Sequence, residues 1–97
     1  MYLLVKVVEI KGHCPVYKVG DSFRLEDGFR LVADIPLCMH ALAALLPFYN
    51  ALRFCEPKQL GLAEKDNPAS AYVQCPDSVS RTDGGTVIFE ISKVEKP

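Results

Sequence analysis

The two ends of the chain have the clearest strand patterns, and these patterns match in length and apolarity. Residues 2–11 are dominated by β-branched side chains, with Val5 and Val7 on either side of Lys6. Residues 86–94 alternate in the same way. Two long apolar strands bury most surface when they lie side by side under a shared covering element. The sequence therefore predicts a sheet in which the first and last strands pair.

Shorter elements are expected between these two strands, separated by turn residues such as Gly, Pro and Asp. The predicted short strands are residues 22–25, 29–32 and 71–74. The first two are joined by a turn at residues 26–28. Two polar segments, residues 56–70 and 77–85, are predicted to be loops, the first with one short helical turn.

The most apolar segment of the chain predicts a long helix over residues 36–54. Asp34 suits the positive end of a helix, and Pro36 is tolerated in the first turn. Apolar side chains occur almost all round this helix, which is typical of a buried helix or one that forms an interface. Pro47 removes a backbone hydrogen bond and is expected to kink it. The predicted fold class is α+β: a small, mainly antiparallel sheet with paired terminal strands and one long, Pro47-kinked central helix, in a single domain over residues 1–97.

Charge and hydropathy argue against two classes of partner, nucleic acids and membranes. The chain has 11 Lys and Arg against 12 Asp and Glu, a net charge of −1. Because these charges form no basic stripe, we expect no nucleic-acid binding.

The start of the chain has no basic leader, and its apolar run is too short for a signal peptide. Residues 35–54 are interrupted by polar side chains and fall short of the ~20 apolar residues of a membrane span. We expect a soluble, cytoplasmic protein that does not bind membranes.

Four cysteines are the strongest indication of function, at positions 14, 38, 55 and 75. Successive cysteines are 24, 17 and 20 positions apart. In a reducing cytosol such thiols more often bind a metal or perform redox chemistry than form structural disulfides. The chain has no Cys-x-x-Cys, so neither a zinc knuckle nor a thioredoxin-type motif is present.

Three of these cysteines are predicted to share a site. Cys14 and Cys75 each follow a predicted strand and precede a proline, and Cys38 lies in the first turn of the predicted helix. A helix N-terminus favours the thiolate form of such a cysteine. Cys55 lies 17 residues after Cys38, or about 25 Å along an unbroken helix. We therefore expect Cys55 to lie outside the site.

A set of three cysteines allows two metal centres. It can hold a [4Fe–4S] cluster with one iron open to an external ligand. It can also hold zinc, with His13 or His40 as the fourth ligand. The ligand types do not choose between these centres. The alternative is that the thiols are small buried hydrophobes and the two histidines ordinary turn and helix-start residues.

Three motifs in this order resemble a family of small, uncharacterised prokaryotic proteins of about this length. The motifs are Gly12-His13-Cys14-Pro15 with Gly20-Asp21, Cys38-Met39-His40-Ala41-Leu42 with Leu46-Pro47, and Cys75-Pro76-Asp77. The resemblance covers nearly the whole chain. It implies that Cys14, Cys38 and Cys75 belong to the family's cysteine pattern, with a metal or iron–sulfur role, and that Cys55 does not.

Three functions follow as hypotheses. The first, which we favour, is a metal- or iron–sulfur-binding protein in electron transfer or cofactor handling, acting as a homo-oligomer with a redox or cofactor-accepting protein partner. The second is a cysteine-dependent enzyme with Cys38 as nucleophile and His40 or His13 as base. The third is an oligomeric scaffold or small-ligand-binding protein without metal, in which the apolar helix forms the interface.

Overall fold

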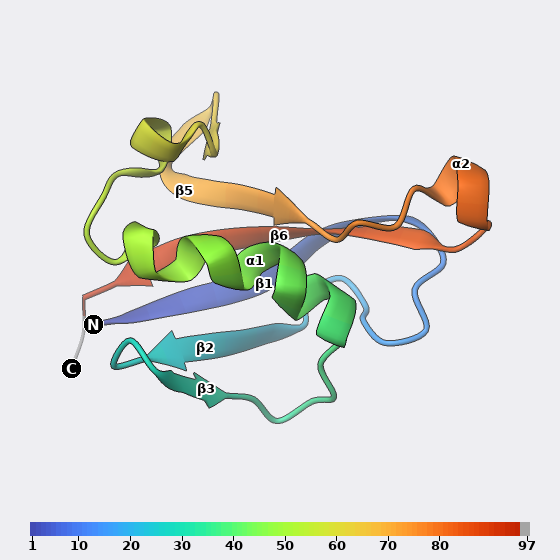
Figure 1. The fold of residues 1–97 in the computed structure, drawn as a ribbon, viewed down its shortest axis with the longest axis horizontal. Helices are drawn as coiled ribbons and strands as arrows, with labels where there is room; N and C mark the ends of the chain where they lie inside the picture. Colours follow the sequence, from blue (N-terminus) through green and yellow to red (C-terminus); the bar gives the residue numbers. More distant parts are fainter. Residues whose placement is uncertain (96–97) are drawn as a thin grey trace.

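The computed structural model describes residues 1–95, which form a six-stranded antiparallel sheet with one helix across it (Figure 1). The strand order is β3-β2-β1-β6-β5-β4. The strands are β1 (Tyr2–Gly12), β2 (Ser22–Glu26), β3 (Arg30–Val32), β4 (Ala63–Glu64), β5 (Asn67–Gln74) and β6 (Gly85–Val94). The helices are α1 (Met39–Leu52), the 3-10 helix η1 (Pro57–Leu60) and the short α2 (Val79–Thr82).

The terminal strands β1 and β6 pair at the centre of the sheet, as the sequence predicts. Their antiparallel register runs from Tyr2 opposite Val94 to Gly12 opposite Gly85. A bulge after Val7 shifts this register by one residue. Because a bulge bends a strand and increases its twist, it redirects the last residues of β1, which lead into the loop that carries Cys14.

One face of the sheet and one side of α1 form the hydrophobic core. From the helix, the core takes Ala41, Leu45 and Leu52. From the sheet, it takes alternate residues of the central strands, in keeping with the two-residue period of a strand. These residues are Leu3, Val5, Val7, Val87, Phe89 and Ile91. Figure 1 shows α1 running across this face.

The predicted fold class is wrong in its balance of elements: the chain is mainly β, with no long central helix among residues 1–95. The helix has 14 residues, from Met39 to Leu52, instead of the 19 expected over residues 36–54. The late start accompanies a tertiary contact at Cys38, whose backbone N–H donates to the hydroxyl of Tyr17. Cys38 is still extended, with φ −81° and ψ 126°, and it is the N-cap of α1. Pro47 lies inside the helix, within its assigned bounds.

The region expected to be a loop, residues 56–70, supplies the extra elements. It contains η1, β4 and the first residues of β5. Strand β5 starts at Asn67 and includes Pro68, but its pairing with β6 begins only at Ala71. A proline is tolerated there because it does not have to donate a hydrogen bond to a central strand. Across residues 1–95, no helix has the length and apolarity needed to cross a membrane.

Candidate thiol pocket

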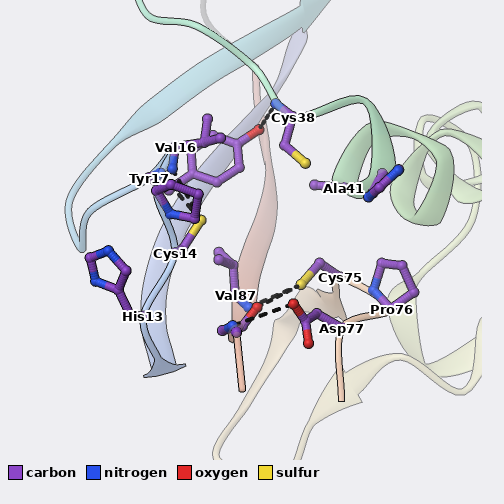
Figure 2. A pocket seen from close by; sticks show the side chains of 14 residues that line it. His13, Cys14, Val16, Tyr17, Cys38, Ala41, Cys75, Pro76, Asp77 and Val87 are labelled. Atoms are coloured by element: carbon purple, nitrogen blue, oxygen red, sulfur yellow. Dashed lines mark hydrogen bonds between the residues drawn. The ribbon is translucent and has the colours of Figure 1, made fainter. Parts of the chain in front are cut away.

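Three cysteines from separate parts of the chain line one cavity of about 210 Å³ (Figure 2). The cavity lies between the loop after β1, the N-terminus of α1 and the connection from β5 to β6. We call it the thiol pocket and define it by Cys14, Tyr17, Cys38, Cys75, Asp77 and Val87, which all line it. Its remaining lining residues are mostly apolar or glycine.

Close backbone packing brings the loop after β1 against the start of β6. The N–H of His13 donates to the carbonyl of Gly84 at 3.0 Å. A Cβ at Gly85 would lie 2.5 Å from the carbonyl carbon of His13, so this position admits no side chain without movement of the backbone. Gly12, with φ +84°, adopts the left-handed conformation that favours glycine. These contacts place Cys14 beside the start of β6, and β6 also contacts Cys75 through Val87.

The sulfur of Cys14 is held by its own loop. Its Sγ accepts hydrogen bonds from the backbone N–H groups of Val16 and Tyr17, both at 3.4 Å. The loop is closed further along by Asp21, whose carboxylate accepts the N–H of Lys18 at 3.0 Å. The Gly20-Asp21 pair therefore builds a turn that supports the pocket and does not line it.

The sulfur of Cys75 is engaged by β6. Cys75 is only 7% exposed, and its N–H donates to the carbonyl of Val87 at 2.9 Å. Its Sγ accepts the N–H of Val87 at 3.2 Å and lies 3.6 Å from the carbonyl oxygen of Gly85, to which its S–H donates. Because both hydrogen bonds tie the sulfur to backbone groups of β6, Cys75 acts as a structural member of the pocket wall.

Cys38 differs from the other two cysteines of the pocket. Its side chain makes no capping hydrogen bond, and no hydrogen bond to its sulfur is found within residues 1–95. Its backbone N–H donates to the hydroxyl of Tyr17 at 2.9 Å. Figure 2 shows its sulfur on the pocket side of the chain, beside the first turn of α1. Cys38 is therefore the thiol most available to a bound molecule.

Tyr17 is the buried aromatic residue of the pocket. Burial raises the pKa of its hydroxyl above 10.0, and the hydrogen bond from Cys38 opposes this in part. Negative charge on Cys38, Cys14 or Asp21 raises the pKa further. The ring packs edge-on against Phe89, with 5.4 Å between centroids. The phenol is therefore both protonated and fixed in orientation.

Asp77 lies in the wall of the pocket that the connection from β5 to β6 forms. Its carboxylate accepts hydrogen bonds from the hydroxyl of Thr82 and, at 3.4 Å, from the N–H of Gly85. Its carbonyl accepts the hydroxyl of Thr86. These bonds tie α2 to the start of β6, so we assign Asp77 a structural role.

The predictions of a [4Fe–4S] cluster and of zinc are wrong. Within residues 1–95, no three His, Cys, Asp or Glu side chains are grouped closely enough to hold a metal ion. Cys14, Cys38 and Cys75 lie on different walls of the cavity, and hydrogen bonds to backbone groups hold the sulfurs of Cys14 and Cys75 there. His13 and His40 also line the cavity but are exposed.

The structure thus brings Cys14, Cys38 and Cys75 to one cavity without arranging them as a metal centre. Cys55 lies elsewhere, in a separate cavity beside Leu52 and Pro57. Sequence reasoning missed Tyr17, although it lies three residues after Cys14, between Pro15 and Gly20. The signal that could have found it is a lone aromatic residue in a loop between a cysteine and a turn.

A scan of protein-family models and searches of curated proteins and of solved structures found no match to this chain.

Proposed function

We propose that the chain binds a small, mainly apolar molecule in the thiol pocket and reacts with it through the thiol of Cys38. One observation carries this proposal: three elements bring cysteines to one cavity, and of these three sulfurs only that of Cys38 has no hydrogen bond within residues 1–95. Cys14 and Cys75 shape the walls, and Cys38 supplies the reactive group.

The position of Cys38 suits a nucleophile. It is the N-cap of α1, beside the free backbone N–H groups of the first helical turn and the positive end of the helix dipole. The first turn of α1 contains no Asp or Glu whose negative charge would lie beside the sulfur. His40 lies two residues further on and lines the same cavity, so it can accept the proton of the thiol.

The cavity limits the size and polarity of the ligand. Its volume of about 210 Å³ is below the range of roughly 300–1,000 Å³ that holds drug-sized ligands. Val16, Ala41 and Val87 contribute apolar surface to its wall. A ligand of a few heavy atoms without formal charge fits this description best.

Alkylation of the intact chain tests this proposal. The full-length protein is treated with a low concentration of iodoacetamide, quenched at intervals and mapped by peptide mass spectrometry. We expect Cys38 to be modified first, Cys75 last, and the fast phase to disappear in Cys38→Ser. Cys55→Ser is the matched control and should retain the fast phase. A Cys38 that reacts no faster than Cys55 would exclude Cys38 as the reactive thiol.

We also propose self-association through a second surface. Phe29, which is 81% exposed, and Leu31 line a groove together with Leu46 of α1. This groove lies at the edge strand β3. The charges of the hairpin beside it are paired within the chain, Arg30 with Asp27 at 3.1 Å and with Glu26 at 2.9 Å, so the apolar side chains of the groove are left to contact a second copy related by a two-fold axis. Sedimentation of Phe29→Ser against the unchanged chain tests this, and a concentration-independent monomer for both would exclude it.

A further inference from the structure

The hydroxyl of Tyr17 has an unused hydrogen-bond donor beside the proposed reactive thiol. The oxygen accepts the N–H of Cys38 at 2.9 Å (Figure 2). Within residues 1–95 the structure contains no hydrogen bond in which this hydroxyl donates. A hydroxyl has one donor and can accept more than one bond, so the proton of Tyr17 remains available. A buried donor without an acceptor costs free energy. A molecule that enters the pocket and supplies an acceptor for this hydroxyl therefore gains binding free energy.

The donor is held in place before any ligand binds. Tyr17 is 5% exposed, and its ring is fixed by the edge-on contact with Phe89. Its own backbone N–H donates to the sulfur of Cys14, which fixes the main chain at this position. The raised pKa of the hydroxyl keeps the proton on the oxygen. A protonated, oriented donor of this kind is suited to stabilise negative charge that develops on a ligand oxygen.

We propose that the substrate is a small, uncharged α,β-unsaturated carbonyl compound whose oxygen accepts the hydrogen bond of Tyr17 while Cys38 attacks the β-carbon. This inference rests on the proposed function, in which Cys38 is the reactive thiol. It adds the chemical class of the substrate and makes Tyr17 a catalytic residue.

The reaction is an addition and needs no oxidant or reductant. The thiol of Cys38 first loses its proton, which His40 or solvent accepts. The sulfur then forms a bond to the β-carbon, and the π electrons of the carbon–carbon double bond move through the conjugated system to the carbonyl oxygen. Tyr17 donates its hydrogen bond to this oxygen, and a proton from solvent finally adds to the α-carbon. The net change is addition of S–H across the double bond.

Two thiol reagents separate the role of Tyr17 from that of Cys38. The probes are 2-cyclohexenone, which has a conjugated carbonyl, and iodomethane, which alkylates thiolates and contains no oxygen. In Tyr17→Phe we expect the rate of cyclohexenone addition at Cys38 to fall about tenfold or more, with the iodomethane rate within about twofold, because only the first reaction develops charge on an oxygen. Circular dichroism and thermal unfolding establish that the variant is folded.

The outcomes distinguish failure of this inference from failure of the proposed function. An equal slowing of both probes in Tyr17→Phe would mean that Tyr17 only positions Cys38 through its N–H, and the substrate class would be withdrawn. If Cys38 of the unchanged chain reacts with neither probe faster than Cys55, the proposed function itself fails.

A second measurement uses the unchanged chain and does not depend on the folding of a variant. Cyclohexanone and methylenecyclohexane have nearly the same shape, but only the ketone has an oxygen acceptor. We expect cyclohexanone to protect Cys38 from iodomethane and methylenecyclohexane to protect it much less. Equal protection by the two compounds would contradict a hydrogen bond from Tyr17 to the ligand.

Discussion

The backbone N–H of Cys38 donates a 2.9 Å hydrogen bond to the hydroxyl of Tyr17, which lies 21 residues earlier in the chain. This bond connects the loop after β1 to the residue that caps α1. It therefore joins two walls of the thiol pocket and satisfies one of the N–H groups at the start of the helix.

Removal of the Tyr17 hydroxyl should destabilise the fold modestly. Tyr17→Phe deprives the N–H of Cys38 of its acceptor, and we expect the free energy of unfolding to fall by about 1–3 kcal/mol, the usual cost of an unsatisfied buried group. Urea unfolding measures the change. Tyr49→Phe is the matched control, since it removes a hydroxyl that donates to the carbonyl of Gly28 at 3.0 Å in a more exposed place. An equal or larger effect at Tyr49 would contradict the special role of the bond to Tyr17.

Stability should decrease in alkaline solution because two tyrosines have a raised pKa in the folded chain. Burial is the main cause for both Tyr17 and Tyr72, and the hydrogen bond from Tyr72 to Glu90 contributes at the second. The unfolded chain loses these protons near the ordinary pKa of 10.0, before the folded chain does. The stabilising contribution is therefore complete below pH 10.0 and is lost as the pH rises through the raised pKa.

Urea unfolding at a series of alkaline pH values measures this loss. The variants Tyr17→Phe and Tyr72→Phe should each show a shallower decrease above pH 10.0 than the unchanged chain. The double variant should be shallower still. If stability falls equally steeply in the unchanged chain and in the double variant, the alkaline loss of stability is caused by groups other than these two tyrosines.

A side chain at Gly85 should disturb the pocket as well as the fold. Its Cβ would lie 2.5 Å from the carbonyl carbon of His13, which is backbone and cannot turn aside. We expect Gly85→Ala to cost about 1–3 kcal/mol, as overpacking usually does, and to change the alkylation rate of Cys38. Gly61→Ala is the control: a Cβ there meets nothing within 4 Å, although φ is +73°. It should lower stability by strain alone and leave the Cys38 rate unchanged.

Two adjacent leucines of α1 should respond differently to truncation. Leu45 is 0% exposed in the core, whereas Leu46 is 37% exposed. Leu45→Ala should lower the free energy of unfolding by about 2–5 kcal/mol, because it removes buried surface and leaves a cavity. Leu46→Ala should cost clearly less, as the smaller loss of buried area implies. Equal losses in thermal or urea unfolding would contradict the assignment of the buried face of α1.

The strand predictions succeed where local pattern and tertiary environment agree. Residues 2–11 and 86–94 are rich in β-branched and other apolar side chains, and they form the paired central strands β1 and β6. The short helical turn predicted within residues 56–70 is η1, but the prediction missed β4 and the start of β5, because this strand structure depends on neighbouring strands. Ala63 pairs with Ala71, and Leu62 accepts the N–H of Tyr72 at its carbonyl, so a segment without a strand pattern joins the sheet through β5.

The metal prediction is wrong for a reason of distance. Residue types and element ends predict that thiols meet, but a metal centre needs donor atoms within a few ångströms of one point. The close packing of Gly85 against His13 and the hydrogen bonds between Cys75 and Val87 set where the sulfurs of Cys14 and Cys75 lie. Neither contact has a signature in the sequence.

By itself the sequence determined the central strand pair, the presence of one apolar helix and the candidate cysteines, because strand period, helical period and residue chemistry are local properties. The tertiary structure decided that the helix is short, that the sheet has six strands, and that Cys14, Cys38 and Cys75 line a cavity with Tyr17 in place of a metal centre. These features depend on contacts between residues far apart in the chain, and such contacts leave no periodic trace in the sequence.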